Sequence, residues 1–328
     1  MAEPKEAHKL YPLKFKPILK EKVWGGGKLH ALFHKEEGSN TGESWELSGV
    51  TDAVSIVSNG ALKGKNLNDL LGSYQSKLVG RRVFKQFGNQ FPLLFKFIDA
   101  AEDLSVQLHP NDELAKIRHD SFGKTEMWYV LEAEQNARLI LGFNKEMDER
   151  TYKKHLSENN ITAILNSEPV LKGDAFFIAP GTVHAIGAGI VLAEIQQTSD
   201  ITYRIYDWDR PGLDGVMREL HNDFAIDAIN YEALNAKQDY IDVKNETVPI
   251  CSSPYFETNK LRLSKTIQKD YTKLDSFVVY MCVDGEVVIR DGAYSENLIK
   301  GETLLLSATS KIVHIETENA TLLEVYIP

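Results

Sequence analysis

The sequence predicts a mainly β protein built from two related β-barrels with a few peripheral helices. Much of the chain consists of short segments rich in β-branched, aromatic and aliphatic residues, interrupted by Gly, Pro, Asn and Asp. Helical patterns do not alternate with these segments, which favours an antiparallel sandwich or barrel over a parallel sheet. A weak internal repeat predicts the second barrel: GDAFFI at 173–178 resembles GETLLL at 301–306, and WYVL at 128–131 resembles VYMC at 279–282.

The strand signals fall into two groups along the chain. The first group covers 91–100, 127–133, 138–143, 174–179 and 189–196. The second group covers 259–267, 276–290, 302–307, 311–316 and 320–327.

Helices are fewer and lie between the strand groups or beside them. Apolar residues at helical spacing follow Asn66, which predicts a helix capped by Asn66 that runs toward Val83. A solvated helix is predicted over 145–157, and a third helical stretch over 214–236. We therefore expect three parts, namely a first barrel with a helical insert (13–212), a helical connection (213–240) and a second barrel (241–328).

The net charge, the start of the chain and the cysteines limit the kinds of binding partner and the cellular location that we expect. The formal net charge is −10 and the pI is about 5.5, so the overall field does not attract nucleic acid or an anionic membrane. A phosphorylated small molecule needs only a local cluster of cations and remains compatible with this charge. The start of the chain has no apolar signal core, and Cys251 and Cys282 lie in apolar stretches that predict buried thiols. These features predict a cytoplasmic protein, and they carry no signal for an oligomeric state.

Four residues on or beside predicted strands form a candidate metal site. Gln107 and His109 are two apart in a strand pattern, so both side chains face the same side. Glu126 opens the next strand signal, and His184 follows a Pro-Gly turn. Two imidazoles, a carboxylate and an amide oxygen suit Zn²⁺ with a position left for substrate. The spacing alone leaves the alternative that each His is a hydrogen-bonded core residue.

Several stretches of sequence, in the same order, resemble the type I phosphomannose isomerases, more narrowly their short bacterial form. The stretches are FPLLFKFIDA, LSVQLHPND, GKTEMWYVLEA, APGTVHAIGAGIVLAEIQ and SDITYRIYDWDR, with WGGGKL and GESWELSG before them. The resemblance covers roughly 13–220 well and the remainder only in pattern. It implies cupin-like (jelly-roll) barrels and an aldose–ketose isomerase that interconverts mannose 6-phosphate and fructose 6-phosphate.

The resemblance also implies roles for individual residues. It implies one Zn²⁺ per chain, held by Gln107, His109, Glu126 and His184. It places a catalytic Arg in an Asp-x-x-x-Arg element on Asp200 and Arg204, and the acidic residue often proposed as the base on Glu194. Long family members insert a helical domain between the Glu and the second His and carry a Lys-containing segment after the Arg. The short segment 127–183 and the sequence IYDWDR at 205–210 depart from both patterns, which leaves the phosphate contacts open.

Three further residues are candidates for substrate contacts. Lys124 lies two residues before Glu126 and shares its face if the strand begins early. Lys96 alternates with phenylalanines, so its side chain points into a site or reaches solvent. Ser105 lies two residues before Gln107 in the same strand pattern. We expect Lys124 to bind an oxygen or the phosphate of the sugar, with Lys96 and Ser105 as further substrate contacts.

The expected mechanism passes through a cis-enediol, with Glu194 as base, Arg204 stabilising the enediolate and Zn²⁺ polarising sugar oxygens. Two alternatives remain. One is another cupin isomerase, acting on glucose 6-phosphate or an unphosphorylated sugar. The other is a non-catalytic, metal-containing sugar-binding cupin, against which the retention of Asp200, Arg204 and Glu194 argues. No matching ligand set follows residue 240, so the second barrel is expected to be ligand-free and structural.

Overall fold

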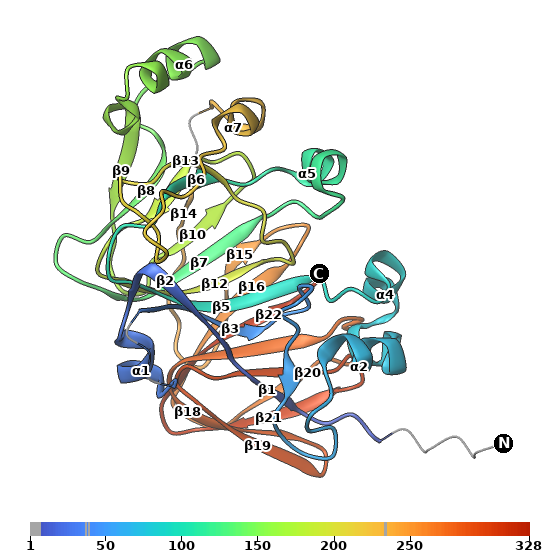
Figure 1. Cartoon of the computed structure of the whole chain (residues 1–328). Helices are drawn as coiled ribbons and strands as arrows, with labels where there is room; N and C mark the ends of the chain where they lie inside the picture. Colours follow the sequence, from blue (N-terminus) through green and yellow to red (C-terminus); the bar gives the residue numbers. More distant parts are fainter. Residues whose placement is uncertain (1–7, 37, 39, 233–234) are drawn as a thin grey trace. The chain divides into compact units, whose positions relative to one another are not determined.

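A computed structural model describes residues 8–36, 38, 40–232 and 235–328, and its contacts group them into two compact units (Figure 1). Unit 1 contains 8–18, 46–92 and 240–328, and unit 2 contains 19–45 and 93–239. Both units are therefore assembled from separate stretches of the chain, whereas the sequence predicts consecutive parts with boundaries at 212 and 240. The reason is visible in β1 (Leu13–Lys16), which pairs antiparallel with β20 (Thr303–Leu306) near the other end of the chain.

Unit 2 is built around two antiparallel sheets. The seven-stranded sheet has the order β14 (Lys237–Gln238), β10 (Ala175–Ile178), β7 (Glu126–Ala133), β12 (Ile190–Gln197), β5 (Leu93–Ala100), β3 (Thr41–Leu47) and β2 (Ile18–Gly26). The five-stranded sheet has the order β13 (Tyr203–Tyr206), β6 (Val106–Leu108), β11 (His184–Ile186), β8 (Arg138–Phe143) and β9 (Leu165–Pro169). The predicted strands of the first group are confirmed.

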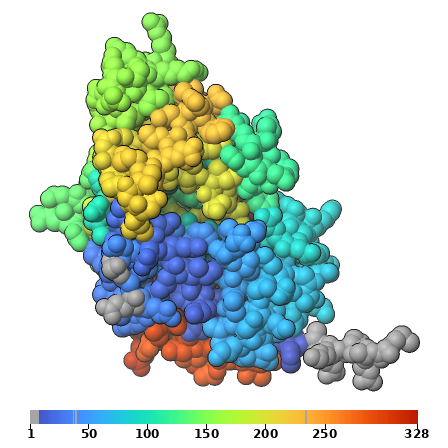
Figure 2. Space-filling model, in the orientation of Figure 1, coloured from blue at the N-terminus to red at the C-terminus, as the bar shows by residue number. Residues whose placement is uncertain are grey.

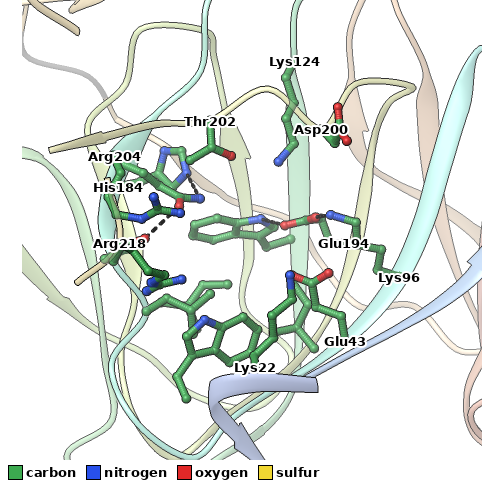
Figure 3. Close-up of a pocket in the computed structure, with 18 of the residues that line it drawn as sticks. Lys22, Glu43, Lys96, Lys124, His184, Glu194, Asp200, Thr202, Arg204 and Arg218 are labelled. Atoms are coloured by element: carbon green, nitrogen blue, oxygen red, sulfur yellow. Dashed lines mark hydrogen bonds and ion pairs between the residues drawn. The ribbon is translucent and has the colours of Figure 1, made fainter. Parts of the chain in front are cut away.

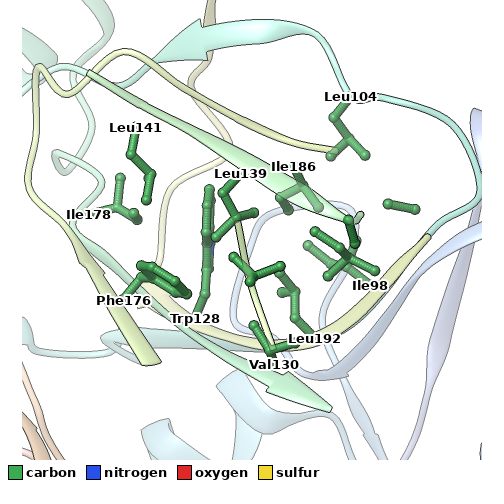
Figure 4. Packing of buried hydrophobic residues seen from close by; sticks show 14 of the residues in the cluster. Ile98, Leu104, Trp128, Val130, Leu139, Leu141, Phe176, Ile178, Ile186 and Leu192 are labelled. Carbon is green, nitrogen blue, oxygen red and sulfur yellow. The ribbon is translucent and has the colours of Figure 1, made fainter. Parts of the chain in front are cut away.

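Apolar side chains of the two sheets meet in one buried cluster (Figure 4). Alternate residues of each strand enter it, as Trp128 and Val130 do from β7 and Leu139 and Leu141 from β8. Each fully buried aliphatic or aromatic side chain contributes roughly 1.5–3 kcal/mol. This cluster fixes the two sheets face to face and leaves the polar residues of the same strands around a pocket beside it.

Short helices of unit 2 lie in the segments that connect its strands. The helix predicted over 145–157 is α6 (Glu149–Ser157), and it begins later because the side chain of Asp148 accepts a hydrogen bond from Thr151 N. Within 214–236 only α7 (Asn222–Ala228) is helical among the described residues, so that prediction was too long. Two helices were not predicted, α1 (Lys28–Phe33) and α5 (Asp112–His119).

Unit 1 contains a ten-stranded antiparallel sheet system and a helical segment. Its main path is β15 (Thr247–Ser252), β16 (Glu257–Leu263), β22 (Ala320–Tyr326), β18 (Val278–Asp291), β20, β1 and β4 (Ile56–Val57), with β17 (Ile267–Asp270), β19 (Tyr294–Ile299) and β21 (Ile312–Glu316) off this path. The strands bury a second apolar cluster of their own. The mainly β fold is confirmed. The described pairings form open sheets rather than continuously hydrogen-bonded barrels.

The helix predicted after Asn66 is confirmed at its start and interrupted later. Asn66 caps α2 (Leu67–Tyr74) by accepting a hydrogen bond from Asp69 N. The chain then breaks at Gln75 (φ 50°) and Gly80 (φ 95°), which separate α3 (Ser76–Val79) and α4 (Arg81–Phe87). At Gly80 a side chain would meet the backbone of Asp275, so only glycine fits there.

The internal repeat corresponds to two equivalent hairpins. Gly173 N donates to Val130 O at 2.8 Å, and Gly301 N donates to Cys282 O at 2.8 Å, both glycines having positive φ. Trp128 therefore corresponds to Tyr280, one residue beyond the match at Val279 that the sequence indicated. By the same register Glu126 corresponds to Val278, because they pair with the equivalent residues Ile178 and Leu306.

Two smaller expectations concern cysteines and membranes. Cys251 and Cys282 are both buried free thiols, as predicted. Within the described residues, no helix combines the length and the apolar character that crossing a membrane requires.

Candidate active site

A polar pocket opens within unit 2, beside the buried cluster, and strands of both sheets supply its walls (Figure 3). Charged side chains dominate its lining. The cations are Lys22, Lys96, Lys124, Arg204 and Arg218, and the carboxylates are Glu43, Glu194 and Asp200. In a chain of net charge −10, this local excess of cations favours an anionic ligand.

Three of the predicted metal ligands converge next to this pocket. His109, Glu126 and His184 are buried and offer ligand atoms within 4.8 Å of one another. His109 Nε2 lies 3.2 Å from Glu126 Oε1, and His184 Nε2 lies 3.9 Å from Glu126 Oε2. The strand pairing of β6, β7 and β11 with their neighbours produces this convergence from residues far apart in sequence.

Backbone carbonyls fix the orientation of both imidazoles. His109 Nδ1 donates to Ile201 O at 2.8 Å, and His184 Nδ1 donates to Thr182 O at 2.9 Å. Each Nε2 therefore presents a lone pair toward the cluster. Burial, followed by the charge of Lys124, lowers the pKa of His109 to about 4, and burial also lowers the pKa of His184. Both imidazoles are thus neutral near pH 7, the form that binds a metal.

Glu126 supplies the negative charge of the cluster. Burial raises its pKa, but the charge of Lys124 is the largest opposing cause and the pKa is held well below its ordinary value. Both carboxylate oxygens are buried without a well-aligned hydrogen bond, although Lys124 Nζ lies 2.8 Å from Oε1. Two neutral imidazoles and an under-satisfied carboxylate are a donor set that a divalent cation fits.

Gln107 lies at the edge of the His109–Glu126–His184 cluster, and the amide nitrogen rather than the amide oxygen is directed toward His184. Its Nε2 lies 3.5 Å from His184 Nε2, while its Oε1 accepts a hydrogen bond from Ser105 Oγ at 3.1 Å. Rotating the amide by half a turn would exchange these two ends and present the oxygen to the cluster. Ser105, predicted as a substrate contact, lines the pocket and holds this amide.

A row of three buried polar residues crosses the seven-stranded sheet at the floor of the pocket. Glu194 pairs across strands with Lys96 on β5 and with Trp128 on β7. Its Oε1 accepts from Lys96 Nζ at 2.7 Å, and its Oε2 accepts from Trp128 Nε1 at 3.0 Å. Burial lowers the pKa of Lys96, but Glu194 and then Glu43 raise it above its ordinary value, so the ammonium is maintained. Lys96 thus points into the pocket, one of the two orientations the sequence allowed.

Arg204 lies in the five-stranded sheet, in register with two of the metal-site residues. Arg204 pairs with Gln107, which pairs in turn with His184. Its Nη1 donates to Glu219 O at 2.9 Å. Asp200 also lines the pocket, but Figure 3 shows it on the Lys124 side, whereas Arg204 lies on the His184 side.

The sequence interpretation missed three charged pocket residues, Lys22, Glu43 and Arg218. Lys22 and Glu43 form an ion pair of 3.3 Å, and Trp45 Nε1 donates to Glu43 Oε2 at 2.7 Å. Burial raises the pKa of Glu43, but Lys96 and Lys22 together lower it to about 2. A period-2 signal was present, because Lys22 and Trp24, like Glu43 and Trp45, are two apart in strands and all line the pocket.

Known proteins match the chain along most of its length. Residues 12–160 match the family model for the phosphomannose isomerase type I catalytic domain, and 245–327 match that for the mannose-6-phosphate isomerase cupin domain. The mannose-6-phosphate isomerase ManA of Bacillus subtilis is 36% identical over 300 residues, which cover 90% of this chain and 92% of the relative. The mannose-6-phosphate isomerase of Streptococcus mutans is 34% identical over 307 residues, 92% of this chain and 93% of the relative.

A solved structure agrees with these sequence relatives. The crystal structure of mannose 6-phosphate isomerase from Bacillus subtilis superimposes with a TM-score of 0.87 and 28% identity, and covers 96% of this chain and 99% of that one. The match extends through both the catalytic part and the C-terminal cupin part. With two relatives above 30% identity over nine-tenths of its length, the chain belongs to the type I phosphomannose isomerase family.

Proposed function

We propose that this chain interconverts mannose 6-phosphate and fructose 6-phosphate, with one Zn²⁺ per chain as its metal. The observation that carries the proposal is a single pocket in which a buried His-Glu-His cluster adjoins a buried carboxylate and an excess of cations. Such a site can bind a sugar phosphate and act on its carbonyl end. The family relationship supports the reaction and the substrate.

His109, Glu126 and His184 would hold the ion, with Gln107 as a fourth ligand after rotation of its amide. A bound Zn²⁺ would polarise oxygens at the carbonyl end of the open-chain sugar. The two backbone carbonyls that orient the imidazoles keep their lone pairs aimed at one point, so the ligands need little rearrangement. The corresponding position in unit 1 is Val278 instead of Glu126, which supports a structural, ligand-free role for the second cupin part.

The proton transfer is assigned to Glu194. In this scheme its carboxylate removes the proton from C2 of mannose 6-phosphate, the C–H electron pair forms the C1–C2 double bond, and the carbonyl π pair moves to O1. Return of the proton from Glu194 to C1, with transfer of the O2 hydroxyl proton to O1, then gives the C2 carbonyl of fructose 6-phosphate. Lys96 and Trp128 fix the carboxylate from both sides, which limits its freedom to one orientation. Arg204 stabilises the enediolate charge, and Lys124 contacts a sugar oxygen.

A coupled assay that detects fructose 6-phosphate formed from mannose 6-phosphate tests this function. Purified protein should turn over the substrate, lose activity with a chelator and regain it with Zn²⁺. A panel that includes glucose 6-phosphate and unphosphorylated mannose tests the competing isomerase assignment. Stoichiometric metal without turnover of any panel member would instead support a metal-containing sugar-binding cupin.

A further inference from the structure

The segment that follows β13 returns to the pocket through a hairpin. Pro211 and Met217 form a β-bridge, and Gly212 N donates to Val216 O at 2.7 Å, which closes the turn. The end of the hairpin is tied to β13, because His221 N donates to Arg204 O at 2.7 Å. The yellow and gold residues of this region border a hollow in the surface (Figure 2). The hairpin thereby returns Arg218 to the lining of the pocket.

A buried carboxylate holds Arg218 in one orientation. Arg218 Nε donates to Asp207 Oδ2 at 2.6 Å, and its Nη2 donates to Asp207 Oδ1 at 2.5 Å, while the side chain of Asp207 is only 4% exposed. This fork uses one edge of the planar guanidinium. The remaining N–H groups, on Nη1 and the outer side of Nη2, are available to a ligand in the pocket.

Arg204 lies near Arg218, and one of its own N–H donors lacks a hydrogen-bond partner. Burial, followed by the charge of Arg218, lowers the pKa of Arg204, which indicates two cations in close proximity. The Nε of Arg204 is buried and makes no hydrogen bond. Two neighbouring guanidinium groups with unused donors favour an anionic ligand here, and because Arg204 is assigned to the enediolate, Arg218 is left for the phosphate dianion.

The position along the sheet fits the far end of a sugar phosphate. His184, Gln107 and Arg204 are cross-strand neighbours on β11, β6 and β13, so His184 and Arg204 are separated by two strand spacings, roughly 10 Å between their backbones. Arg218 comes from the hairpin beyond β13. The carbonyl and the phosphate are at opposite ends of a hexose 6-phosphate, so a sugar held at the metal cluster would extend its phosphate toward the hairpin.

We propose that Arg218, oriented by Asp207, is the phosphate-binding residue of this enzyme and selects phosphorylated over unphosphorylated sugars. The inference rests on the proposed function for the identity of the sugar. Arg210 follows Arg204 in the segment where long family members are basic, but its Nη1 and Nη2 are engaged elsewhere, with Glu102 Oε2 at 3.1 Å and Asp103 O at 2.5 Å, and only its buried Nε makes no hydrogen bond. Arg210 also contacts Asp207 but does not line the pocket, so it is a matched control.

The test compares Arg218→Gln with Arg210→Gln in the metal-loaded enzyme. Arg218→Gln should raise the KM for mannose 6-phosphate and the inhibition constant for inorganic phosphate by roughly 10- to 100-fold, the range expected for a hydrogen bond to a charged group. Its kcat should change by less than about threefold, because the phosphate is bound equally in ground and transition states. Arg210→Gln should leave both constants near those of the parent enzyme. Arg218→Lys, which keeps the charge without the fork, should lie between the two.

Two results would overturn the inference: parental KM and phosphate inhibition in Arg218→Gln, or an equal loss in Arg210→Gln. If Arg218→Gln does not fold, the Arg218→Lys values decide, and parental constants there would refute the assignment. Calorimetric titration with inorganic phosphate separates this inference from the proposed function, since it needs no turnover. Binding of phosphate that depends on Arg218 would support the subsite even in a protein that isomerises no sugar, and active enzyme indifferent to Arg218 would refute only the subsite.

Discussion

Replacing Glu194 by Gln should impair both stability and catalysis, and the structure separates the two effects. Glu194 and Lys96 are 4% and 5% exposed, and their charged atoms are 2.7 Å apart. Removing one member of a buried ion pair costs about 3–5 kcal/mol, because the other is left without compensation. Glu43 offers Lys96 a second carboxylate, so we expect the lower end, about 3 kcal/mol, for Glu194→Gln. At about 2–4 °C per kcal/mol, the melting temperature should fall by roughly 6–12 °C.

The complementary change, Lys96→Met, should cost more. It leaves Glu194 with the indole N–H of Trp128 but without a cation at its other oxygen. We expect a loss of about 5 kcal/mol, because the buried carboxylate is left without the other member of its ion pair. The double variant should lose less than the sum of the singles, since an amide and a thioether are neutral. Urea unfolding of the four proteins at fixed metal content measures this cycle.

Catalysis provides the second readout of Glu194→Gln. Loss of a general base is expected to lower kcat by about 10²–10⁴, well beyond any effect of reduced stability at 25 °C. Glu324→Gln is the matched control, because Glu324 occupies the equivalent strand position in unit 1, is buried, and lines no part of this pocket. A folded Glu194→Gln protein that keeps kcat within tenfold of the parent would exclude Glu194 as the base. If the losses of unfolding free energy in Glu194→Gln and Lys96→Met simply add in the double variant, the buried pair is not coupled.

Three further predictions concern the metal, the enediolate and pH. The double variant His109→Ala/His184→Ala should lose stoichiometric metal by elemental analysis, and metal retained at one per chain would refute the assigned ligands. Arg204→Ala should lower kcat on the order of 10²–10³ with little change in KM or metal content, whereas a raised KM at near-normal kcat would reassign Arg204 to the phosphate. The pKa of Glu43 is lowered from 4.5 to about 2, so its carboxylate stabilises the fold above about pH 4.5 by about 3 kcal/mol. That stability should be lost as the pH falls through 2, and urea unfolding of Glu43→Gln should show a flatter acid limb than the parent.

Local periodicity indicated which residues could form the His-Glu-His cluster, but it left open whether each imidazole is only a hydrogen-bonded core residue. Gln107 and His109 share a face because a strand has a period of two, and Glu126 lies at the start of a strand that the apolar pattern marks. His184 begins β11, a strand that the sequence indicated only by the Pro-Gly turn before it. The family resemblance then assigned the roles. The same reasoning placed the two predicted groups of strands, but it did not indicate β2, β3 or β13.

Other features depend on long-range pairing that no local pattern encodes. Lys22 and Glu43 reach the pocket because β2 and β3 are neighbours at one end of the seven-stranded sheet. Arg218 reaches it through a hairpin in a segment for which the sequence predicted a helix, over 214–236, and the exposed apolar residues Val216 and Met217 lie in this hairpin. The break at Gln75 was also hidden, because a positive φ at a residue other than glycine is set by the surrounding structure rather than by propensity.

The two halves of the repeat allow the proposed catalytic glutamate to be compared with a structural one. Glu194 pairs with Trp128 and Lys96, and Glu324 occupies the same register with Tyr280 and Asn259. Glu324 is as buried as Glu194 and accepts from Asn259 Nδ2 at 2.9 Å, from Lys269 and from two tyrosines.

Burial and tight pairing therefore do not by themselves identify a base, because the repeat provides both at a position without metal ligands. What Glu194 has in addition is its surroundings. It shares a pocket with His184 and Arg204, while the counterpart of Glu126 in unit 1 is the apolar Val278. Lys96 and Trp128 then fix the position of the Glu194 carboxylate, and the neighbouring imidazoles and cations of the pocket supply the surroundings that a base requires. If this reasoning is correct, introducing Glu at Val278 would not create activity in unit 1, because two buried imidazoles would still be missing there.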